Sequence, residues 1–198
     1  MNAAPVIGLF GGSFDPIHRA HVEVARRARD QVPCDEVWFV PADRTPFKPD
    51  GPHVTAADRV DLIEIAIAGE PGLSVSTVEL GVPGRRSVET VAVLQAAHPG
   101  TRWRWILGED AFESLPRWAD PDRFARMAPP IVQPRPGSNA ERVTTFADAP
   151  VTWLVGEALD ISSTSIREAL CRGERPAELD PHVWEHIEER DLYRETSR

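Results

Sequence analysis

Apolar residues along this chain gather in short runs, which alternate with longer stretches that mix apolar and polar positions. The short runs are bounded by proline, glycine and polar residues, as buried strands are. The strands they predict are Val6–Phe10, Glu36–Val40, Leu73–Thr77, Arg102–Leu107, Pro130–Gln133 and Val151–Val155. The mixed stretches predict helices, which are Ala20–Val32, Ala56–Ala68, Val88–Ala97, Asp110–Leu115, Pro121–Met127, Ser163–Arg172 and Pro181–Glu189.

This alternation of strand and helix predicts the architecture. Chains that alternate in this way build a parallel sheet with helices on both faces, so we expect an α/β fold with a doubly wound sheet. Two irregular segments, Pro41–Pro52 and Arg135–Asn139 with its continuation toward Pro150, are too short to divide the chain, which predicts a single domain over residues 1–198. In such folds a ligand binds beyond the carboxyl ends of the strands, near the point where the strand order switches.

Composition narrows the classes of function. The chain has 198 residues and a formal net charge of −9, which disfavours a general nucleic-acid-binding protein because such a protein needs a broad basic surface. The first apolar run, Val6–Phe10, is too short for a signal peptide or a membrane span. Cys34 and Cys171 form no Cys-x-x-Cys pair, which favours a reduced, cytoplasmic setting. A small anionic substrate is compatible with the charge, and a homo-oligomer is left open.

The stretch from Gly8 to His21 carries the strongest chemical signal. Gly11 and Gly12 follow the first predicted strand, where they allow a tight turn and a close approach of the backbone to a ligand. His18 and His21 are three residues apart at the start of the next helix and share one face of it. Cationic or hydrogen-bonding imidazoles at a helix N-terminus suit phosphate oxygens. We reject a metal site here, because the pair lacks a third ligand nearby.

A second signal lies at Ile161–Arg167, where a helix is predicted to start. Ser163 and Thr164 can cap the free N–H groups of that helix, and the same N–H groups can instead bind a phosphate. Arg167 shares the face of these hydroxyls, so hydroxyls, amides and a guanidinium converge on one spot. Taken alone, the segment is more simply explained as a capped surface helix. Its occurrence together with the first motif favours phosphate binding instead. Lys48, in the proline-rich segment, can reach over a neighbouring phosphate as a point charge.

These motifs occur in a fixed order along the chain. The first is Gly11-Gly12-Ser13-Phe14-Asp15-Pro16-x-His18-x-x-His21, and the last two are Ile161-Ser162-Ser163-Thr164-x-Ile166-Arg167 and Leu192-Tyr193-Arg194. Between them come Gly108-Glu109-Asp110, followed by Trp118, and Arg135-Pro136-Gly137. In this order they resemble the bacterial nicotinate mononucleotide adenylyltransferases, a family of the nucleotidyltransferase superfamily. The resemblance runs the whole chain and implies a Rossmann-like, doubly wound parallel sheet with flanking helices.

The resemblance implies an enzyme of NAD biosynthesis that transfers the adenylyl group of ATP to nicotinate mononucleotide and releases pyrophosphate, with Mg²⁺. Its partners are then small molecules, with no nucleic acid and no membrane. The implied catalytic residues are His18, His21, Lys48 and Arg167. The implied ATP-binding residues are Gly11, Gly12, Ser13, Phe14, Gly108, Asp110, Ile161, Ser163 and Thr164. The implied acceptor-binding residues are Thr90, Trp118, Arg135 and Arg86, with Trp118 stacked on the pyridine ring.

Three departures from the family pattern leave the acceptor open. Ala20 stands where the family has glycine, next to the expected adenine site, and Phe47 replaces the histidine of the family loop. The segment Arg85–Thr90 lacks the family's Ser-Tyr-Thr element, which helps recognise the nicotinate end. Another phosphorylated acceptor, such as nicotinamide mononucleotide or phosphopantetheine, is therefore an alternative. A nucleotide-binding module without catalysis is a third interpretation.

Overall fold

A six-stranded parallel sheet forms the centre of the protein. The computed structural model describes residues 4–43, 52–138, 142–157 and 159–194. The strands are β1 Val6–Gly12, β2 Glu36–Pro41, β3 Leu73–Val75, β4 Arg102–Gly108, β5 Pro130–Gln133 and β8 Thr152–Trp153. They lie in the order β3-β2-β1-β4-β5-β8, and each neighbouring pair is parallel. This order confirms the α/β fold with a doubly wound parallel sheet.

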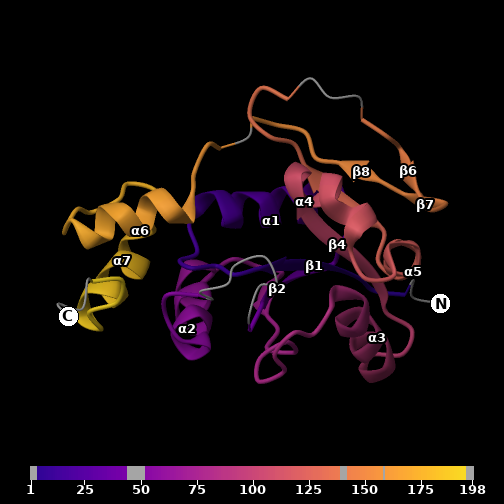
Figure 1. The fold of residues 1–198 in the computed structure, drawn as a ribbon. Helices are drawn as coiled ribbons and strands as arrows, with labels where there is room; N and C mark the ends of the chain where they lie inside the picture. Colours follow the sequence, from indigo (N-terminus) through magenta and orange to yellow (C-terminus); the bar gives the residue numbers. More distant parts are fainter. Residues whose placement is uncertain (1–3, 44–51, 139–141, 158, 195–198) are drawn as a thin grey trace.

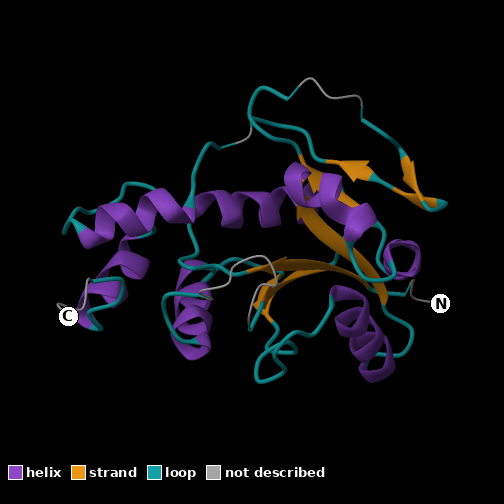
Figure 2. Ribbon diagram, viewed as in Figure 1, coloured by secondary structure: helices purple, strands orange, loops and turns teal. Residues whose placement is uncertain are grey.

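Helices cover both faces of the sheet (Figure 1 and Figure 2). One face carries α1 Arg19–Gln31, α2 Ala56–Ala66, α6 Ser163–Cys171 and α7 Pro181–Glu189. The other carries α3 Ser87–Ala97, α4 Glu109–Ser114, the 3-10 helix η1 Leu115–Arg117 and α5 Pro121–Met127. Alternate side chains of β1 explain the two layers: Phe10 belongs to the hydrophobic cluster of α1 and α2, and Leu9 to that of α3 and α5. No helix in the described ranges has the length and apolar character needed to cross a membrane.

The region after β5 contains a hairpin that the sequence pattern does not predict. An antiparallel pair joins β6 Thr145–Phe146 to β7 Ala149–Pro150. Ala147 and Asp148 between them have φ angles of 48° and 64°, the left-handed conformation that a two-residue hairpin turn requires. Ala147-Asp148 is not the Asn-Gly or Asp-Gly dipeptide that marks such a turn in a sequence. The hairpin therefore could not be predicted from its turn residues.

Gly11 and Gly12 serve the packing of β1, which corrects the expectation that they form a tight turn. Both residues belong to the strand. A Cβ atom on Gly11 would lie 2.6 Å from Cζ2 of Trp105, and one on Gly12 would lie 3.0 Å from Cζ of Phe14. The turn itself follows at Phe14, whose φ angle is 46°. Aromatic rings therefore occupy the space that side chains at the two glycine positions would need.

The strand order switches between β1 and β4, and this switch places the candidate site. From β1 the chain passes through α1 to β2 on one side, whereas β4 pairs with β1 on the other side. Strand β1 ends at Gly12 and β4 ends at Gly108, so the starts of α1 and α4 lie beyond adjacent strand ends. A crevice at this position is where open α/β sheets bind their ligands.

Candidate active site

Two histidines stand at the start of α1, beyond the carboxyl end of β1. His18 is the N-cap of the helix and His21 is its third residue. The backbone N–H of His18 donates to Nδ1 of His21 at 3.3 Å, and the rings stack with their centroids 3.7 Å apart. Phe10 and Phe14 meet the His21 ring edge-on. The capping bond and these aromatic contacts hold both imidazoles in one orientation.

Burial keeps both imidazoles neutral. Desolvation lowers the pKa of His18 to about 4, although a backbone hydrogen bond partly opposes the shift. Burial, and then the charge that His18 would carry, hold the pKa of His21 well below its usual value. The sequence leaves open whether these imidazoles are cations or neutral hydrogen-bonding groups. The lowered pKa values favour the neutral form. Because Nδ1 of His21 accepts a hydrogen bond, its proton lies on Nε2, which can donate to a ligand oxygen.

The N-terminus of α6 meets the turn that follows β1. Ser163 donates from Oγ to the backbone oxygen of Pro16 at 3.0 Å. Arg167 donates from Nη1 to the backbone oxygen of Asp15 at 2.6 Å and from Nη2 to Oγ1 of Thr164 at 3.3 Å. The structure thus brings two sequence motifs into contact that are separated by more than half of the chain. Helix amides, hydroxyls and a guanidinium lie beside the histidine pair, an arrangement suited to anionic oxygen atoms.

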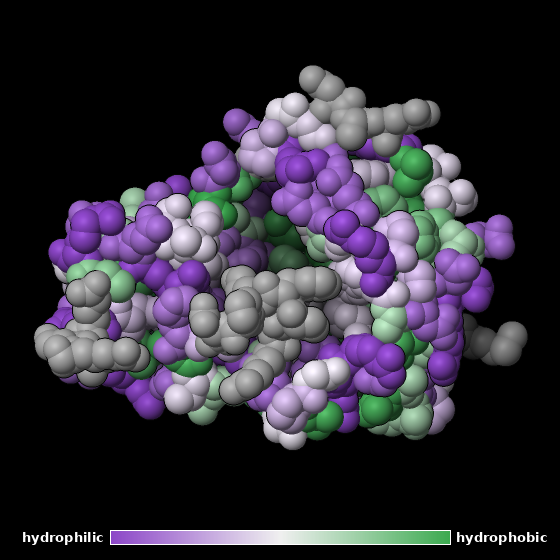
Figure 3. Space-filling model, in the orientation of Figure 1, coloured by the Kyte–Doolittle hydropathy of each residue, from purple (hydrophilic) through white to green (hydrophobic). Residues whose placement is uncertain are grey.

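A cavity of about 150 Å³ lies between α1 and the ends of β4 and β5. Ala20 and Val24 of α1 form one wall, and Gly108, Asp110 and Arg135 belong to the opposite side. The space-filling view shows the face hollowed between α1 and α4, with hydrophobic residues at the bottom of the hollow (Figure 3). The methyl group of Ala20 is thus part of the cavity wall.

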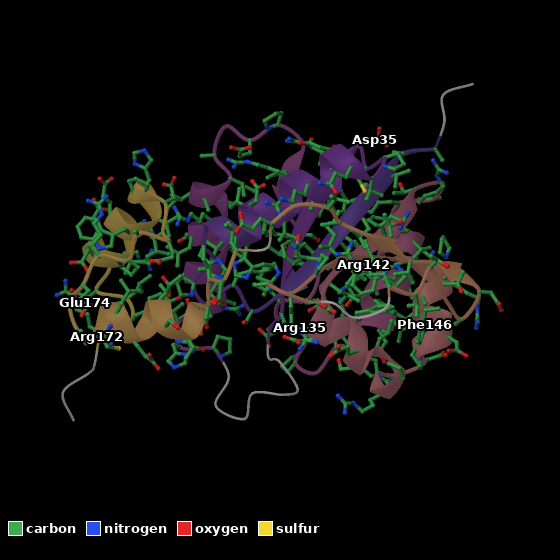
Figure 4. The ribbon with its side chains drawn as sticks, turned by 90° about the horizontal axis from the view of Figure 1, so that it is seen from above. Asp35, Arg135, Arg142, Phe146, Arg172 and Glu174 are labelled. Atoms are coloured by element: carbon green, nitrogen blue, oxygen red, sulfur yellow. The ribbon has the colours of Figure 1, made fainter. Side chains whose placement is uncertain are left out.

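The wall formed by the end of β5 is fastened to α4 by a buried carboxylate. Glu109 is 2% exposed, and its Oε2 accepts the backbone N–H of Arg135 at 2.7 Å while its Oε1 accepts the hydroxyl of Ser138 at 2.6 Å. The partly exposed Arg135 guanidinium, seen from above between α6 and α4 (Figure 4), pairs with Asp110 at 2.6 Å and Glu113 at 2.7 Å. Arg135 therefore lies against the predicted ATP-binding residue Asp110 rather than with the other predicted acceptor residues.

Comparison with known proteins identifies the family. A model of the cytidylyltransferase-like family matches residues 9–169. A Gloeobacter violaceus protein named "Probable nicotinate-nucleotide adenylyltransferase" is 38% identical over 199 residues, which cover 94% of this chain and 95% of that protein. A Bacillus pumilus protein of the same name is 35% identical, with 94% of this chain and 97% of that protein covered. The chain belongs to the nicotinate-nucleotide adenylyltransferase family.

Solved structures agree with this family on the fold. Nicotinic acid mononucleotide adenylyltransferase of Plasmodium falciparum, complexed with NaAD, superposes with a TM-score of 0.80 and 19% identity, covering 96% of this chain and 97% of that chain. The same protein complexed with APC gives a TM-score of 0.79 over the same shares. The family and the Rossmann-like fold predicted from the sequence are thus both confirmed.

In this member of the nicotinate-nucleotide adenylyltransferase family, two predicted acceptor residues lie on α3. Thr90 is fully buried, and its hydroxyl donates to Oε1 of Glu79 at 2.7 Å. Burial raises the pKa of Glu79, and this hydrogen bond partly opposes the rise. Arg86 is the exposed N-cap of α3 and pairs with Glu89 at 2.5 Å. The Thr90 side chain is therefore occupied by Glu79 inside the protein, whereas the Arg86 guanidinium faces solvent.

Trp118, the residue predicted to stack on the acceptor ring, follows η1. Its indole Nε1 donates to Oγ of Ser114 at 2.9 Å, and its ring lies 5.5 Å from that of Phe124 between centroids. The side chain is partly buried against the cluster of α3 and α5. The hydrogen bond and the ring contact hold the indole plane in one orientation.

The remaining predicted residues lie around the turn or outside the described part of the chain. Ser13 accepts a hydrogen bond on its backbone oxygen from Nη1 of Arg59 at 2.7 Å. Ile161 packs against the cluster of α1 and α6. The predicted catalytic residue Lys48, like Phe47, lies outside the described residues.

The sequence did not single out three buried charged residues near the site. Asp15, Arg59 and Glu109 are each 2% exposed or less. Asp15 and Glu109 lie inside the family motifs, but the predicted roles there belong to neighbouring residues. The burial of Arg59 could have been predicted from the sequence. It lies three and four positions before Leu62 and Ile63 on the buried face of its helix, where a charge requires a partner.

Proposed function

We propose that this protein transfers the adenylyl group of ATP to nicotinate mononucleotide, which yields deamido-NAD and pyrophosphate. The observation that carries the proposal is the contact of α6 with the turn after β1, because it gathers the histidine pair and Arg167 at the switch point of the sheet. In this reaction the acceptor phosphate attacks the α-phosphorus in line. The protein must therefore bring two anions together and stabilise the charge of the leaving pyrophosphate.

The neutral histidines suit the role of hydrogen-bond donors to the reacting phosphates. His21 donates from Nε2, since its Nδ1 already accepts the backbone N–H of His18. His18, stacked on it, contacts the same phosphates. A neutral donor stabilises the charge that develops in the transition state and transfers no proton, which fits a reaction without a covalent enzyme intermediate.

Arg167 and the first turn of α6 provide the positive end of the site for the β- and γ-phosphates. The Arg167 guanidinium lies next to Thr164 through Nη2, on the same turn as Ser163. Backbone N–H groups at this helix start add the positive end of the helix dipole. Lys48 is proposed to add a further positive charge, on the sequence alone.

Mg²⁺ accompanies the nucleotide as part of the substrate in this proposal. Among the described residues there is no group of three or more histidine, cysteine, aspartate or glutamate side chains that could hold a metal ion. Mg²⁺ retains water ligands and binds phosphate oxygens, so the triphosphate supplies suitable ligands itself. The ion neutralises charge on the phosphates, while His18, His21 and Arg167 orient them.

The two organic ends of the substrates are assigned to different regions. The cavity bounded by Ala20, Gly108 and Asp110 is proposed for the adenosine, with Gly11, Gly12, Ser13, Phe14 and Ile161 around the nucleotide. Trp118 is proposed to stack on the pyridine ring, with Thr90 and Arg86 serving the acceptor, whereas Arg135 is reassigned to the cavity proposed for the adenosine. We infer a cytoplasmic enzyme whose partners are these small molecules.

A panel of acceptors tests the proposal. The protein is incubated with ATP, Mg²⁺ and one of nicotinate mononucleotide, nicotinamide mononucleotide or phosphopantetheine, and pyrophosphate release is followed. We expect the fastest release with nicotinate mononucleotide. Release with another acceptor alone would overturn the choice of acceptor. If none of the three supports release, adenylyl transfer itself is wrong and a nucleotide-binding module is the better description.

A pair of histidine variants links that activity to the site. His18→Ala should lower kcat by roughly two orders of magnitude, the usual effect of losing one transition-state hydrogen-bond donor. His182→Ala is the matched control, because that residue is an exposed histidine on α7. Equal kcat values in the two variants would remove His18 from the catalytic role. Thermal melting of both variants verifies that they are folded.

A further inference from the structure

The segment between β8 and α6 leaves the edge of the sheet and crosses α1. Strand β8 is the outermost strand, and Leu154 just after it is fully buried and donates its backbone N–H to the backbone oxygen of Val132 at 2.9 Å. Residues 155–157 then run past α1 toward the start of α6, in the orange part of the ribbon (Figure 1). All three are exposed to solvent, so their position depends on hydrogen bonds to α1 more than on burial.

Gln31, the last residue of α1, holds the first residue of this crossing. Its Nε2 donates to the backbone oxygen of Val155 at 2.7 Å, and its Oε1 accepts the backbone N–H of Val155 at 2.8 Å. A residue on a neighbouring antiparallel strand pairs with both backbone groups of its partner in the same way. The carboxamide thus takes the place of a further strand just beyond the end of β8, although the two residues are 124 positions apart in sequence.

Arg27, four residues earlier on α1, holds the other end of the crossing. Its Nη1 donates to the backbone oxygen of Glu157 at 2.7 Å, while its Nε donates to Oε1 of Glu23 at 2.8 Å. Gly156, between the two held residues, has a φ angle of 125°, and a Cβ atom on it would lie 3.0 Å from Cζ of Arg27. Glycine suits both this backbone conformation and this close approach. The backbone therefore passes directly against the guanidinium.

The crossing leads into the wall of the cavity between α1 and the ends of β4 and β5. Leu159 lines this cavity together with Arg27, whereas Gln31 does not line it. The Leu159 side chain is 42% exposed, so it has apolar surface free to pack on a ligand. Its backbone oxygen accepts the N–H of Ile161 at 3.0 Å, shortly before α6 begins. The position of Leu159 in the wall thus depends on where residues 155–157 are held.

We propose that Gln31 and Arg27 are positioning residues that clamp residues 155–157 to α1 and thereby hold Leu159 against the adenosine of bound ATP. This inference rests on the proposed function, which assigns the cavity to the adenosine. A clamped segment is already ordered before the nucleotide arrives, so the entropy of ordering it does not subtract from the free energy of ATP binding. Loss of the clamp should weaken ATP binding and leave the histidine pair and the acceptor residues in place.

Gln31→Ala tests the clamp from outside the cavity. The dissociation constant for Mg²⁺–ATP, measured by calorimetry, and the KM for ATP should both rise about fivefold, the size of one neutral hydrogen bond. The kcat and the KM for the acceptor should stay unchanged, a separation that general loosening of the fold would not produce. Gln95→Ala is the matched control, because Gln95 is an exposed glutamine on α3. An unchanged dissociation constant, or an equal rise in both KM values, would overturn the inference.

A pair of glycine variants tests the contact with Arg27. Gly156→Ala places a methyl group against the guanidinium and should raise the dissociation constant for ATP at least fivefold. Gly100→Ala is the control, because Gly100 also has a positive φ angle, 88°, but its Cβ position is open. It carries the cost of the backbone conformation alone and should bind ATP as the unmodified protein does. Equal dissociation constants for the two variants would show that the contact at Gly156 does not shape the cavity.

Calorimetry with ATP needs no acceptor, so it separates this inference from the proposed function. If the acceptor panel shows no adenylyl transfer while ATP binding still depends on Gln31, the proposed function is wrong and the clamp stands. If nicotinate mononucleotide is adenylylated while Gln31→Ala binds ATP as tightly as the unmodified protein, the clamp alone is wrong. Thermal melting of each variant verifies that it is folded at the temperature of the titration.

Discussion

His18 is buried and His21 is partly buried at the start of α1, and their lack of charge determines how the protein responds to acid. An imidazole has a pKa near 6.5 when it is exposed to water. In the folded protein burial lowers the pKa of His18 to about 4, and that of His21 is lowered as well. Between these values the unfolded chain binds protons that the folded protein does not bind, and this difference favours unfolding.

The free energy of unfolding should therefore fall as the pH is lowered from about 6.5 toward 4. The contribution of His18 is fully present above pH 6.5 and is lost through this window, with a slope of up to about 1.4 kcal/mol per pH unit for one proton. Urea denaturation at pH 7.5, 6.5, 5.5 and 4.5 measures the slope. His18→Gln should flatten it and His182→Gln should leave it unchanged. A His18→Gln variant with the original slope would show that the pKa of His18 is not depressed.

At the scale of secondary-structure elements, one buried carboxylate connects α4 to the end of β5. Burial alone would raise the pKa of Glu109, but hydrogen bonds from Arg135 and Ser138, together with the Arg135 charge, bring it below its usual value. Glu113 binds the same guanidinium from the protein surface. The two glutamates thus share a partner, yet only Glu109 also holds the backbone of the cavity wall.

Glu109→Gln should weaken ATP binding more than catalysis. The amide leaves one of the two hydrogen bonds unmade and loosens the wall at Arg135, so we expect the KM for ATP to rise about fivefold to tenfold with kcat nearly unchanged. Glu113→Gln is the matched control, and its effect on KM should be less than twofold because an exposed ion pair contributes little. Steady-state kinetics with varied ATP measures both. Equal shifts in KM would mean that the buried carboxylate has no special part in shaping the cavity.

The elements themselves could largely be predicted from the sequence, because most strands and helices bury one apolar face. The three-residue strand β3 and the two-residue strand β8 end earlier than predicted, since alternation of residues continues past the last ladder hydrogen bond. The turn at Ala147 and Asp148 was missed because tertiary packing, not a glycine, imposes its left-handed backbone.

The sequence could predict those residues of the candidate site that belong to recognisable motifs. The meeting of Arg167 with Asp15 depends on how α6 docks onto the sheet, and local patterns do not contain that information. The role of Gly11 was misjudged for the same reason: the ring that fills its Cβ position comes from Trp105 on β4. Burial of Asp15 and the neutrality of His21 likewise follow from tertiary packing.

At the scale of the whole molecule, the candidate site joins the first and last thirds of the chain. Asp15 and Arg167, which are in contact, are 152 residues apart in sequence. Helices α6 and α7 lie together at one end of the molecule, next to α1 and α2 (Figure 1). The phosphates of ATP, placed between α1 and α6, would add a further connection between these regions.

ATP should therefore raise the melting temperature of the protein. A ligand at 100 times its dissociation constant stabilises the folded state by about 2.7 kcal/mol. For a chain of this size that corresponds to a rise of roughly 5–10 °C. Differential scanning fluorimetry with Mg²⁺–ATP measures the rise, and adenosine at the same concentration should give a smaller one because it has no phosphates to reach α6. An unchanged melting temperature under saturating ATP would contradict a bridging nucleotide.

The distance in sequence between Asp15 and Arg167 also has a consequence for biosynthesis. A ribosome adding about 5–20 residues per second needs roughly 8–30 s to make the 152 residues between them. During that time Asp15 and Arg59 have emerged, but the guanidinium of Arg167 does not yet exist. The nascent N-terminal part thus lacks the cation that pairs with Asp15 in the folded protein, so the phosphate site can be assembled only late in translation.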